Sequence, residues 1–253
     1  AAGRPERVFD SPRDISVVDD ARAKERSLAD LPSLLDEAPG LSLQWPRASA
    51  AIPALRGQVG RAVAVFLDDI RLSHALTPPA GGDGLAHPLA MVDLFSLRGV
   101  DVLRGASPVL HSADALAGVV TLRRHPLRFD PWRAWDVSGG AYGLFSSAAT
   151  GLVGHAFAEG HLRGFGLRVS GSVQRSDDLV AGRGIGEQPF TRFAQGTLDL
   201  HGAWYISQKT TLRLSYSTLR RHDAPRAARS SARDFSLLRD ELRDLVALRF
   251  RRE

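Results

Sequence analysis

The sequence contains no cysteine, which excludes disulfide bonds and thiolate metal sites. No run of about 18 apolar residues occurs, so a transmembrane helix is not expected. The motifs of common enzyme classes are also absent: there is no HExxH, no GxSxG, and no glycine-rich phosphate loop followed by lysine. We therefore expect neither an enzyme nor a bound cofactor.

What the chain does contain is glycine, 24 residues in 253, against 14 prolines and a single methionine. This composition favours a β-rich protein with many turns. The formal charge of +5 comes from 33 basic and 28 acidic residues spread along the chain. Without a basic cluster interleaved with aromatic residues, nucleic-acid binding is not expected. Attraction to anionic lipid or polysaccharide stays open beside the simpler interpretation that these arginines solvate loops and a polar wall.

One stretch, Val100–Leu122, has a strongly patterned local structure. An alternating strand runs into the corner Arg104-Gly105. Ser107-Pro108 then predicts a helical turn, because serine can cap free N–H groups and proline tolerates the first helical position. Gly118 breaks the turn, and the β-branched run that follows predicts a second strand.

This stretch, VDVLRGASPVLHSADALAGVVTL, resembles the end of the plug domain of TonB-dependent outer-membrane receptors, in which a pattern close to (I/V)EVLRGP is followed by LYG and by GGV. Four positions depart from that pattern: Asp101, His111, Ser112 and Ala117. The last two replace glycines.

Earlier segments resemble the same family in the same order. We expect a short strand over Ser11–Asp19, a helix from Leu28 to Glu37 capped by Ser27, and inward-facing apolar residues in a helical turn over Pro88–Phe95. The further segments that match family motifs are Leu41–Gln44, Ile52–Gln58 and Val63–Ile70. Asp69 stands where the family has glycine, which predicts an altered turn.

From Trp135 onward, apolar and polar residues alternate with period two in about six segments. Such strands occur both in transmembrane β-barrels and in β-sandwiches. The connections favour the barrel, in which short periplasmic turns alternate with longer outer loops. In chain order they are short near Phe145, moderate near Glu159, long at Asp177–Thr191, short at Ser207–Lys209 and long at Arg221–Leu238. Trp204 and Tyr205 lie beside a short link, as an interfacial aromatic girdle requires.

The predicted fold class is therefore an α+β plug domain followed by antiparallel transmembrane β-barrel strands. Six strands cannot close around a plug, so we expect an N-terminal fragment or a truncated product of a longer receptor. The expected divisions are a disordered segment (1–10), the plug (11–124), a linker (125–134) and the first part of the barrel (135–253).

The resemblance also implies site residues. Structural or gating roles fall on Arg56, Gly57, Asp68, Arg104, Gly105 and Gly118, and the two arginines would contact inward-facing acids of the barrel. For ligand binding the candidates are Val59, Arg61, His74 and His87. His74, Asp83 and His87 match no standard metal-ligand spacing, so no metal site is expected.

The implied function is import of a scarce solute, such as an iron–siderophore complex, across the outer membrane of a Gram-negative bacterium. The implied partners are a TonB-type energising complex, a small-molecule ligand, and outer-membrane lipid with lipopolysaccharide. No TonB box is visible in AAGRPERVFD. A diverged receptor that no longer transports, or a soluble β-rich binding module, is the alternative.

Overall fold

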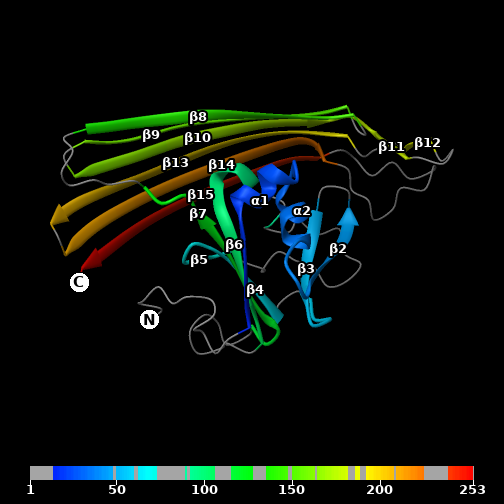
Figure 1. The fold of residues 1–253 in the computed structure, drawn as a ribbon, viewed down its shortest axis with the longest axis horizontal. Helices are drawn as coiled ribbons and strands as arrows, with labels where there is room; N and C mark the ends of the chain where they lie inside the picture. Colours follow the sequence, from blue (N-terminus) through cyan, green and yellow to red (C-terminus); the bar gives the residue numbers. More distant parts are fainter. Residues whose placement is uncertain are drawn as a thin grey trace. The chain divides into compact units, whose positions relative to one another are not determined.

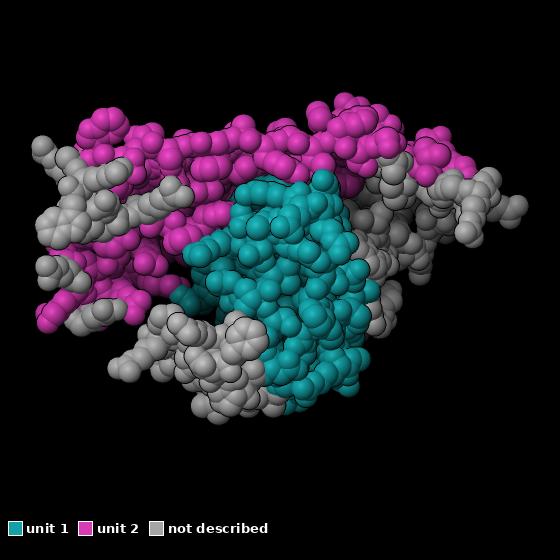
Figure 2. All heavy atoms as spheres, viewed as in Figure 1, with its two compact units in different colours: residues 1–124, 226–235 teal, residues 125–225, 236–253 magenta. Residues whose placement is uncertain are grey.

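The computed structural model describes residues 14–47, 50–59, 62–72, 89, 92–105, 115–127, 135–147, 150–162, 164–181, 186–188, 192–207, 209–224 and 239–252. These residues form two compact units, one up to Arg124 and one from His125 onward (Figure 2). The predicted domain boundaries and the linker at 125–134 stay predictions. No helix among the described residues is long and apolar enough to cross a membrane.

The first unit is built on a five-stranded sheet (Figure 1). Its strands, in spatial order, are β1 (Ile15–Asp19), β6 (Leu97–Arg104), β7 (Gly118–Arg124), β4 (Val63–Leu67) and β5 (Ile70–Arg71). All neighbours are antiparallel except β4 and β7, which run parallel. Beside it, β2 (Leu41–Arg47) and β3 (Ala50–Leu55) form a separate antiparallel pair.

Two short helices connect β1 to β2. Helix α1 (Asp20–Glu25) is capped by Asp19, and α2 (Leu31–Asp36) by Asp30, whose carboxylate accepts from the Ser33 N–H at 2.8 Å. The predicted start at Leu28 with a Ser27 cap is wrong, because Asp30 is the better acceptor and Ser27 takes a positive φ of 52°. Helix α1 was not predicted, since it buries only Ala23.

Buried apolar side chains cover both faces of this sheet, and one of the two clusters consists of Ala64, Phe66, Leu103, Ala115 and Val119. Strand β4 is buried along its whole length. The valines at 63, 65, 100, 102 and 120 and Leu122 are fully or almost fully inaccessible. The predicted inward-facing residues before β6 are confirmed: a short 3-10 turn, η4 (Leu94–Ser96), follows buried side chains at Leu89 and Val92.

The second unit is a six-stranded antiparallel meander of long strands lying side by side (Figure 1). It comprises β8 (Trp135–Ser146), β9 (Gly151–Leu162), β10 (Phe165–Ser176), β13 (Phe193–Ser207), β14 (Thr210–Ala224) and β15 (Arg239–Arg252). A small hairpin, β11 (Leu179–Ala181) with β12 (Gly186–Gln188), lies in the connection between β10 and β13. Among the described residues this sheet is open, with β8 and β15 as its edges.

The six predicted strands are confirmed, with one correction. The link expected near Glu159 lies beyond Leu162 instead, because Glu159 is a member of β9 and pairs in register with Arg168 of β10. Polar residues there occupy the polar face of a continuing strand rather than a turn.

Candidate functional site

Arg104 holds together three segments of the first unit. Its guanidinium binds the Asp14 carboxylate, the Ser16 hydroxyl and the Pro39 carbonyl, while its own N–H donates to the Asp14 carbonyl at 3.0 Å. The side chain is only 9% exposed. The three acceptors around its two terminal nitrogens stabilise the arrangement, because they compensate for the desolvation of the charge. These contacts connect the beginning of edge strand β1 to β6 and to the segment that follows α2.

The backbone beside this arginine is shaped to receive it. Gly40 has φ of 72°, and a Cβ there would lie 2.9 Å from Arg104 Nε. Gly105, which follows Arg104 in the chain, also has a positive φ of 94°, and a Cβ on it would lie 3.6 Å from Arg56 Nη1. Arg56 itself is exposed and has φ of 52°. The two predicted arginine corners therefore meet at Gly105.

Gly118 is the most constrained position of the unit. Its φ is 154°, and a Cβ would lie 2.3 Å from the Leu103 carbonyl oxygen and 2.8 Å from Leu55 Cδ1. The adjacent Ala117 is buried, donates to the Ala62 carbonyl at 2.9 Å and accepts from the Gly105 N–H at 2.8 Å. Of the family's glycine pair, the second position is the one that has no room for a side chain.

Asp68 closes the turn between β4 and β5. It takes a positive φ of 55°, and its carboxylate accepts from the Arg124 N–H at 3.0 Å. Its own N–H donates to the Leu122 carbonyl at 2.7 Å, and its Oδ2 lies 3.4 Å from Arg124 Nε. The left-handed conformation thus falls on Asp68 and not on its neighbour Asp69, so the turn forms without glycine.

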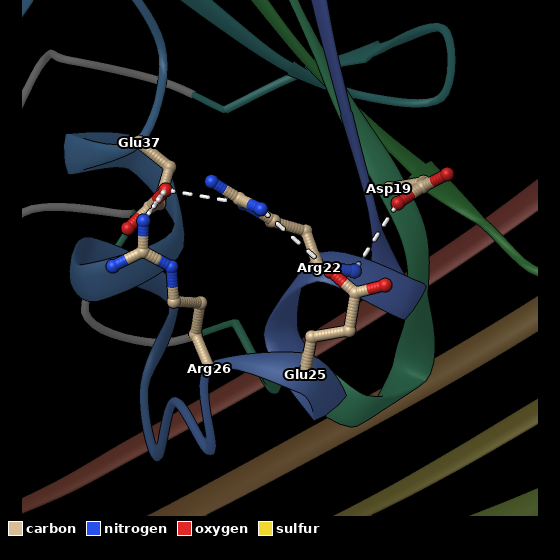
Figure 3. A network of polar contacts seen from close by, with 5 residues as sticks. All are labelled: Asp19, Arg22, Glu25, Arg26 and Glu37. Carbon is tan, nitrogen blue, oxygen red and sulfur yellow. Dashed lines mark hydrogen bonds and ion pairs between the residues drawn. The ribbon is translucent and has the colours of Figure 1, made fainter.

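An ion-pair network joins the two helices (Figure 3). Glu37, at the end of α2, lies 3.3 Å from Arg22 Nε and 3.7 Å from an Arg26 nitrogen. Arg22 also approaches Glu25 at 3.6 Å, and its N–H donates to the Asp19 cap at 3.2 Å. These side chains are largely solvent-exposed, so each pair contributes well under about 1 kcal/mol. The network orients α1 more than it stabilises it.

In the second unit, the two faces of the sheet differ completely. One face, here called the apolar face, carries large hydrophobic side chains that are each at least 40% exposed: Trp135, Val137, Phe145, Leu152, Leu162, Phe165, Leu167, Val173, Leu198, Trp204, Leu214, Leu242, Val246, Leu248 and Phe250. A soluble sheet would cover such a surface, because exposed apolar patches of this size are unfavourable in water.

The register aligns a row of aromatic residues along one end of the apolar face. Trp135, Leu162, Phe165, Trp204, Leu212 and Phe250 are successive neighbours across all six strands. This end lies beside the short links at 163–164 and 208–209. The predicted position of Trp204 beside a short link is confirmed, and it belongs to a row that is mostly aromatic.

The opposite boundary of the apolar face is slanted. Its last apolar residue is Phe145 on β8, Leu152 on β9, Val173 on β10, Leu198 on β13, Tyr216 on β14 and Val246 on β15. In register, Val246 lies level with Gly139, six residues below Phe145. Six residues over five strand spacings correspond to strands tilted by about 40° from the perpendicular to that boundary. Among the described residues of these six strands, Leu242 is the one large apolar side chain of this face that lies beyond the boundary, after Asp244.

The other face, here called the polar face, contains a buried ion pair. Arg168 Nη1 lies 2.6 Å from Glu159 Oε2, and the Ser138 hydroxyl donates to Glu159 Oε1 at 3.1 Å. The guanidinium also stacks over the Phe157 ring, 4.2 Å from its centroid. Both charged side chains are 8% exposed, so removal of either partner would leave an uncompensated charge.

Residues 7–119 match the family model described as the TonB-dependent receptor plug domain. This chain carries a TonB-dependent receptor plug domain. The match covers β1 to β6 and the first two residues of β7, and it includes the predicted plug residues Arg56, Gly57, Asp68, Arg104, Gly105 and Gly118. In sequence, no curated protein matches the chain.

The plug and the six-stranded sheet together are similar to solved receptors. The chain is 18% identical to the hemophore receptor HasR of Serratia marcescens, solved as a double mutant with its hemophore HasA and heme, with a TM-score of 0.72 over 85% of this chain and 32% of that one. It is 20% identical to the copper transporter OprC, with a TM-score of 0.66 over 82% of this chain and 30% of that one. It is 17% identical to the siderophore receptor PirA of Acinetobacter baumannii, with a TM-score of 0.62 over 82% of this chain and 31% of that one.

These similarities establish the fold: a plug-type α+β unit followed by six strands of an unclosed antiparallel sheet of the kind found in TonB-dependent receptor barrels. The chain spans about a third of the length of these receptors. The family is one of transporters and receptors rather than enzymes.

The structure brings some predicted site residues together and leaves others apart. Arg56, Gly57, Arg104, Gly105 and Gly118 gather at one corner of the plug, whereas Asp68 lies at the turn after β4. Val59 is 40% exposed. Arg61, His74 and His87 lie outside the described residues. Within the described part of the chain, no three His, Asp or Glu side chains form a group that could hold a metal ion.

Sequence reasoning missed the partners of Arg104. Asp14, Ser16 and Pro39 all belong to segments with family motifs, but nothing in their spacing indicates that one guanidinium reaches all three. The close contact of Gly40 with Arg104 was not predicted either, because it depends on tertiary packing that leaves no periodic signal.

Asp101, which replaces the family's glutamate, gives the plug a pH dependence. Burial raises the pKa of its carboxyl, although Arg123 at 2.9 Å acts in the opposite direction. A raised folded-state pKa favours folding below the ordinary value, and this contribution is lost as the pH rises through the folded-state pKa.

We therefore expect Asp101→Asn to gain stability relative to the natural protein as the pH rises from about 3 to about 7. Because Asp101 is about a third exposed, the gain should be below about 1 kcal/mol. Denaturant unfolding across this pH range measures it. A difference between the two proteins that is constant with pH, or of opposite slope, would contradict the assignment.

Proposed function

We propose that this chain forms the plug and the first barrel strands of an outer-membrane receptor that imports a scarce solute, driven by a TonB-type complex. In this proposal a small-molecule ligand binds from outside, the plug rearranges, and the solute passes the barrel. The site of action is the outer membrane of a Gram-negative bacterium. No residue is assigned a catalytic role.

The observation that carries the proposal is the slanted apolar face of a sheet that follows a plug domain in the sequence. A tilt of about 40° lies within the range of transmembrane β-barrels, which is about 35–45°. Along β8, the ten residue steps from Trp135 to Phe145 then span about 25 Å perpendicular to the boundary, the height of the apolar band in outer-membrane barrels. The apolar stretch shortens across the sheet to the four steps from Val246 to Phe250 on β15. A β-sandwich has no reason to cut its apolar face obliquely to the register.

The similar solved proteins suggest the class of solute. They include receptors for siderophores and for a hemophore that carries heme, and a copper transporter. All concern metals or metal complexes. An iron–siderophore complex is therefore the first solute to test.

The test is uptake of a panel of radiolabelled ferric siderophores by cells that express the full-length protein. We expect accumulation that depends on the protein and disappears in an otherwise identical strain without the energising complex. As a control for general effects of substitution, Arg98→Ala changes an exposed arginine of β6 and should transport normally. Uptake that persists in the strain without the complex would contradict the energy-driven mechanism.

A further inference from the structure

Charged residues are distributed unevenly over the polar face of the six-stranded sheet. On β8, β9, β10 and β13 this face is acidic on balance, with Asp136, Glu159 and Asp199 against Arg168. On β14 and β15, the register pairs between Thr211/Arg251 and Arg221/Glu241 place five arginines and one acid on this face. The arginines are Arg213, Arg221, Arg243, Arg249 and Arg251, and the acid is Glu241. These two strands therefore form a basic wall.

Three of these arginines form a cluster at one end of the wall, here called the basic cluster: Arg213, Arg249 and Arg251. Arg213 and Arg249 are direct neighbours across the strands, and Arg251 is the next residue of β15 on the same face. Such spacings are about 5 Å and about 7 Å, so the three guanidinium groups are within reach of one small ligand. The described positions around them carry no acid: Ala203, Tyr205, Thr211, Ser215 and Ala247. Glu253 follows in the sequence but lies outside the described residues.

The close approach of Arg213 and Arg249 is unfavourable for the sheet by itself, because like charges directly opposite each other weaken strand pairing. Arg249 and Arg251 have further interactions. Arg213 is exposed, and its guanidinium forms no ion pair with the described residues. An anion held between Arg213 and Arg249 would replace this repulsion with charge-assisted hydrogen bonds on both sides. The cluster thus favours an anionic ligand over a neutral one.

The opposite end of the wall favours the same class of ligand. Arg221 is buried there, with its Nε 3.0 Å from the Gln195 amide oxygen and its guanidinium over the Phe193 ring, 5.7 Å from the centroid. Gln195 is uncharged, so it orients the guanidinium without neutralising it. Arg243 adds a second positive charge in this part of the wall, against Glu241, the register partner of Arg221. Positive charge therefore predominates at both ends of the wall.

We propose that the basic cluster binds the transported solute, and that this solute is a metal chelate with net negative charge, such as a ferric catecholate or carboxylate complex. The inference rests on the proposed function, in which the polar face lines the solute path. The cluster adjoins the short link at 208–209, which faces the periplasm in that orientation, so it receives the solute near the end of the path. Guanidinium groups suit such a solute, because their planar donors bind paired anionic oxygens.

The experiment compares the energised uptake of two iron complexes of similar size by cells that express the full-length protein. One is a ferric tris-catecholate complex, which is anionic, and the other is a ferric tris-hydroxamate complex, which is neutral. The variants are Arg213→Gln, its combination with Arg249→Gln, and Arg213→Lys, which keeps the charge. The matched control is Arg220→Gln, an exposed arginine of the same strand on the apolar face. Rates are divided by the amount of each protein in the outer membrane.

We expect the natural protein to prefer the anionic complex. The double variant should lose this preference through at least about tenfold slower maximal uptake of that complex, since each arginine contributes charge-assisted hydrogen bonds. Arg213→Lys should keep most of the rate, and Arg220→Gln all of it. Stability gives a second measurement: without chelate, Arg213→Gln should unfold at a higher denaturant concentration than the natural protein, because the repulsion is gone.

Three results would overturn the inference and leave the proposed function standing. They are equal or preferred uptake of the neutral complex by the natural protein, unchanged uptake of the anionic complex by the double variant, and equal or lower stability of Arg213→Gln. Absence of energy-dependent uptake of every complex tested would refute the proposed function, and the inference with it.

Discussion

Replacing Gly118 by valine is expected to prevent the plug from folding. The valine Cβ would stand 2.3 Å from the Leu103 carbonyl oxygen, a backbone atom of the paired strand that cannot move without breaking the sheet. The positive φ of 154° adds backbone strain. Steric overlap of this kind belongs to the most destabilising class of substitutions, about 4 kcal/mol or more. Loss of amide protection throughout β4, β6 and β7 in hydrogen exchange would report it.

Gly57→Ala is the matched control for this prediction. Gly57 also has a positive φ, 77°, but a Cβ there meets nothing within 4 Å. Only the conformational cost of about 1 kcal/mol should remain. If both variants were tolerated equally well, the close contact at Gly118 would not be the reason for glycine at that position.

Replacing Arg104 by glutamine should detach the edge strand β1 while leaving the rest of the plug sheet in place. The variant loses the charged donor that meets Asp14, Ser16 and the Pro39 carbonyl, at a cost of about 2–3 kcal/mol. Strand β1 itself contributes little to the core, since only Val18 of it is buried. Faster hydrogen exchange confined to β1 is therefore expected.

Two further variants make this prediction specific. Arg104→Lys should recover only part of the loss, because an ammonium cannot present the planar set of donors that a guanidinium offers. Arg98→Ala removes an exposed arginine of the same strand and should be neutral. Exchange that rises equally in β4 and β7 of the Arg104→Gln protein would show that the arginine supports the whole sheet.

The order of the fold could be predicted because its signals are local. Period-two alternation predicts the long strands. The Arg104-Gly105 corner marks the end of β6, and Gly118 marks the start of β7. Helix α1 could not be predicted, because a six-residue helix that buries one alanine leaves no apolar stripe. The turn at Asp68 differed from expectation, since aspartate there both adopts positive φ and accepts the Arg124 N–H.

The slanted boundary was also beyond sequence reasoning. Each strand shows where its own apolar face ends, but only the register relates one strand to the next. Leu198 and Val173 seem unrelated along the chain until the pairing of β10 with β13 places them in adjacent rows.

Spin labels at two positions of one register row give the most direct test of whether tilted strands of this sheet cross a membrane. Gly143 on β8 and Arg220 on β14 lie in the same row of the apolar face. The chain has no cysteine, so Gly143→Cys and Arg220→Cys each carry a single nitroxide. In bilayers containing the full-length protein, the account predicts that oxygen dissolved in lipid relaxes the label at 143 and aqueous nickel complex relaxes the label at 220. Equal accessibility of both labels to the same reagent would contradict it.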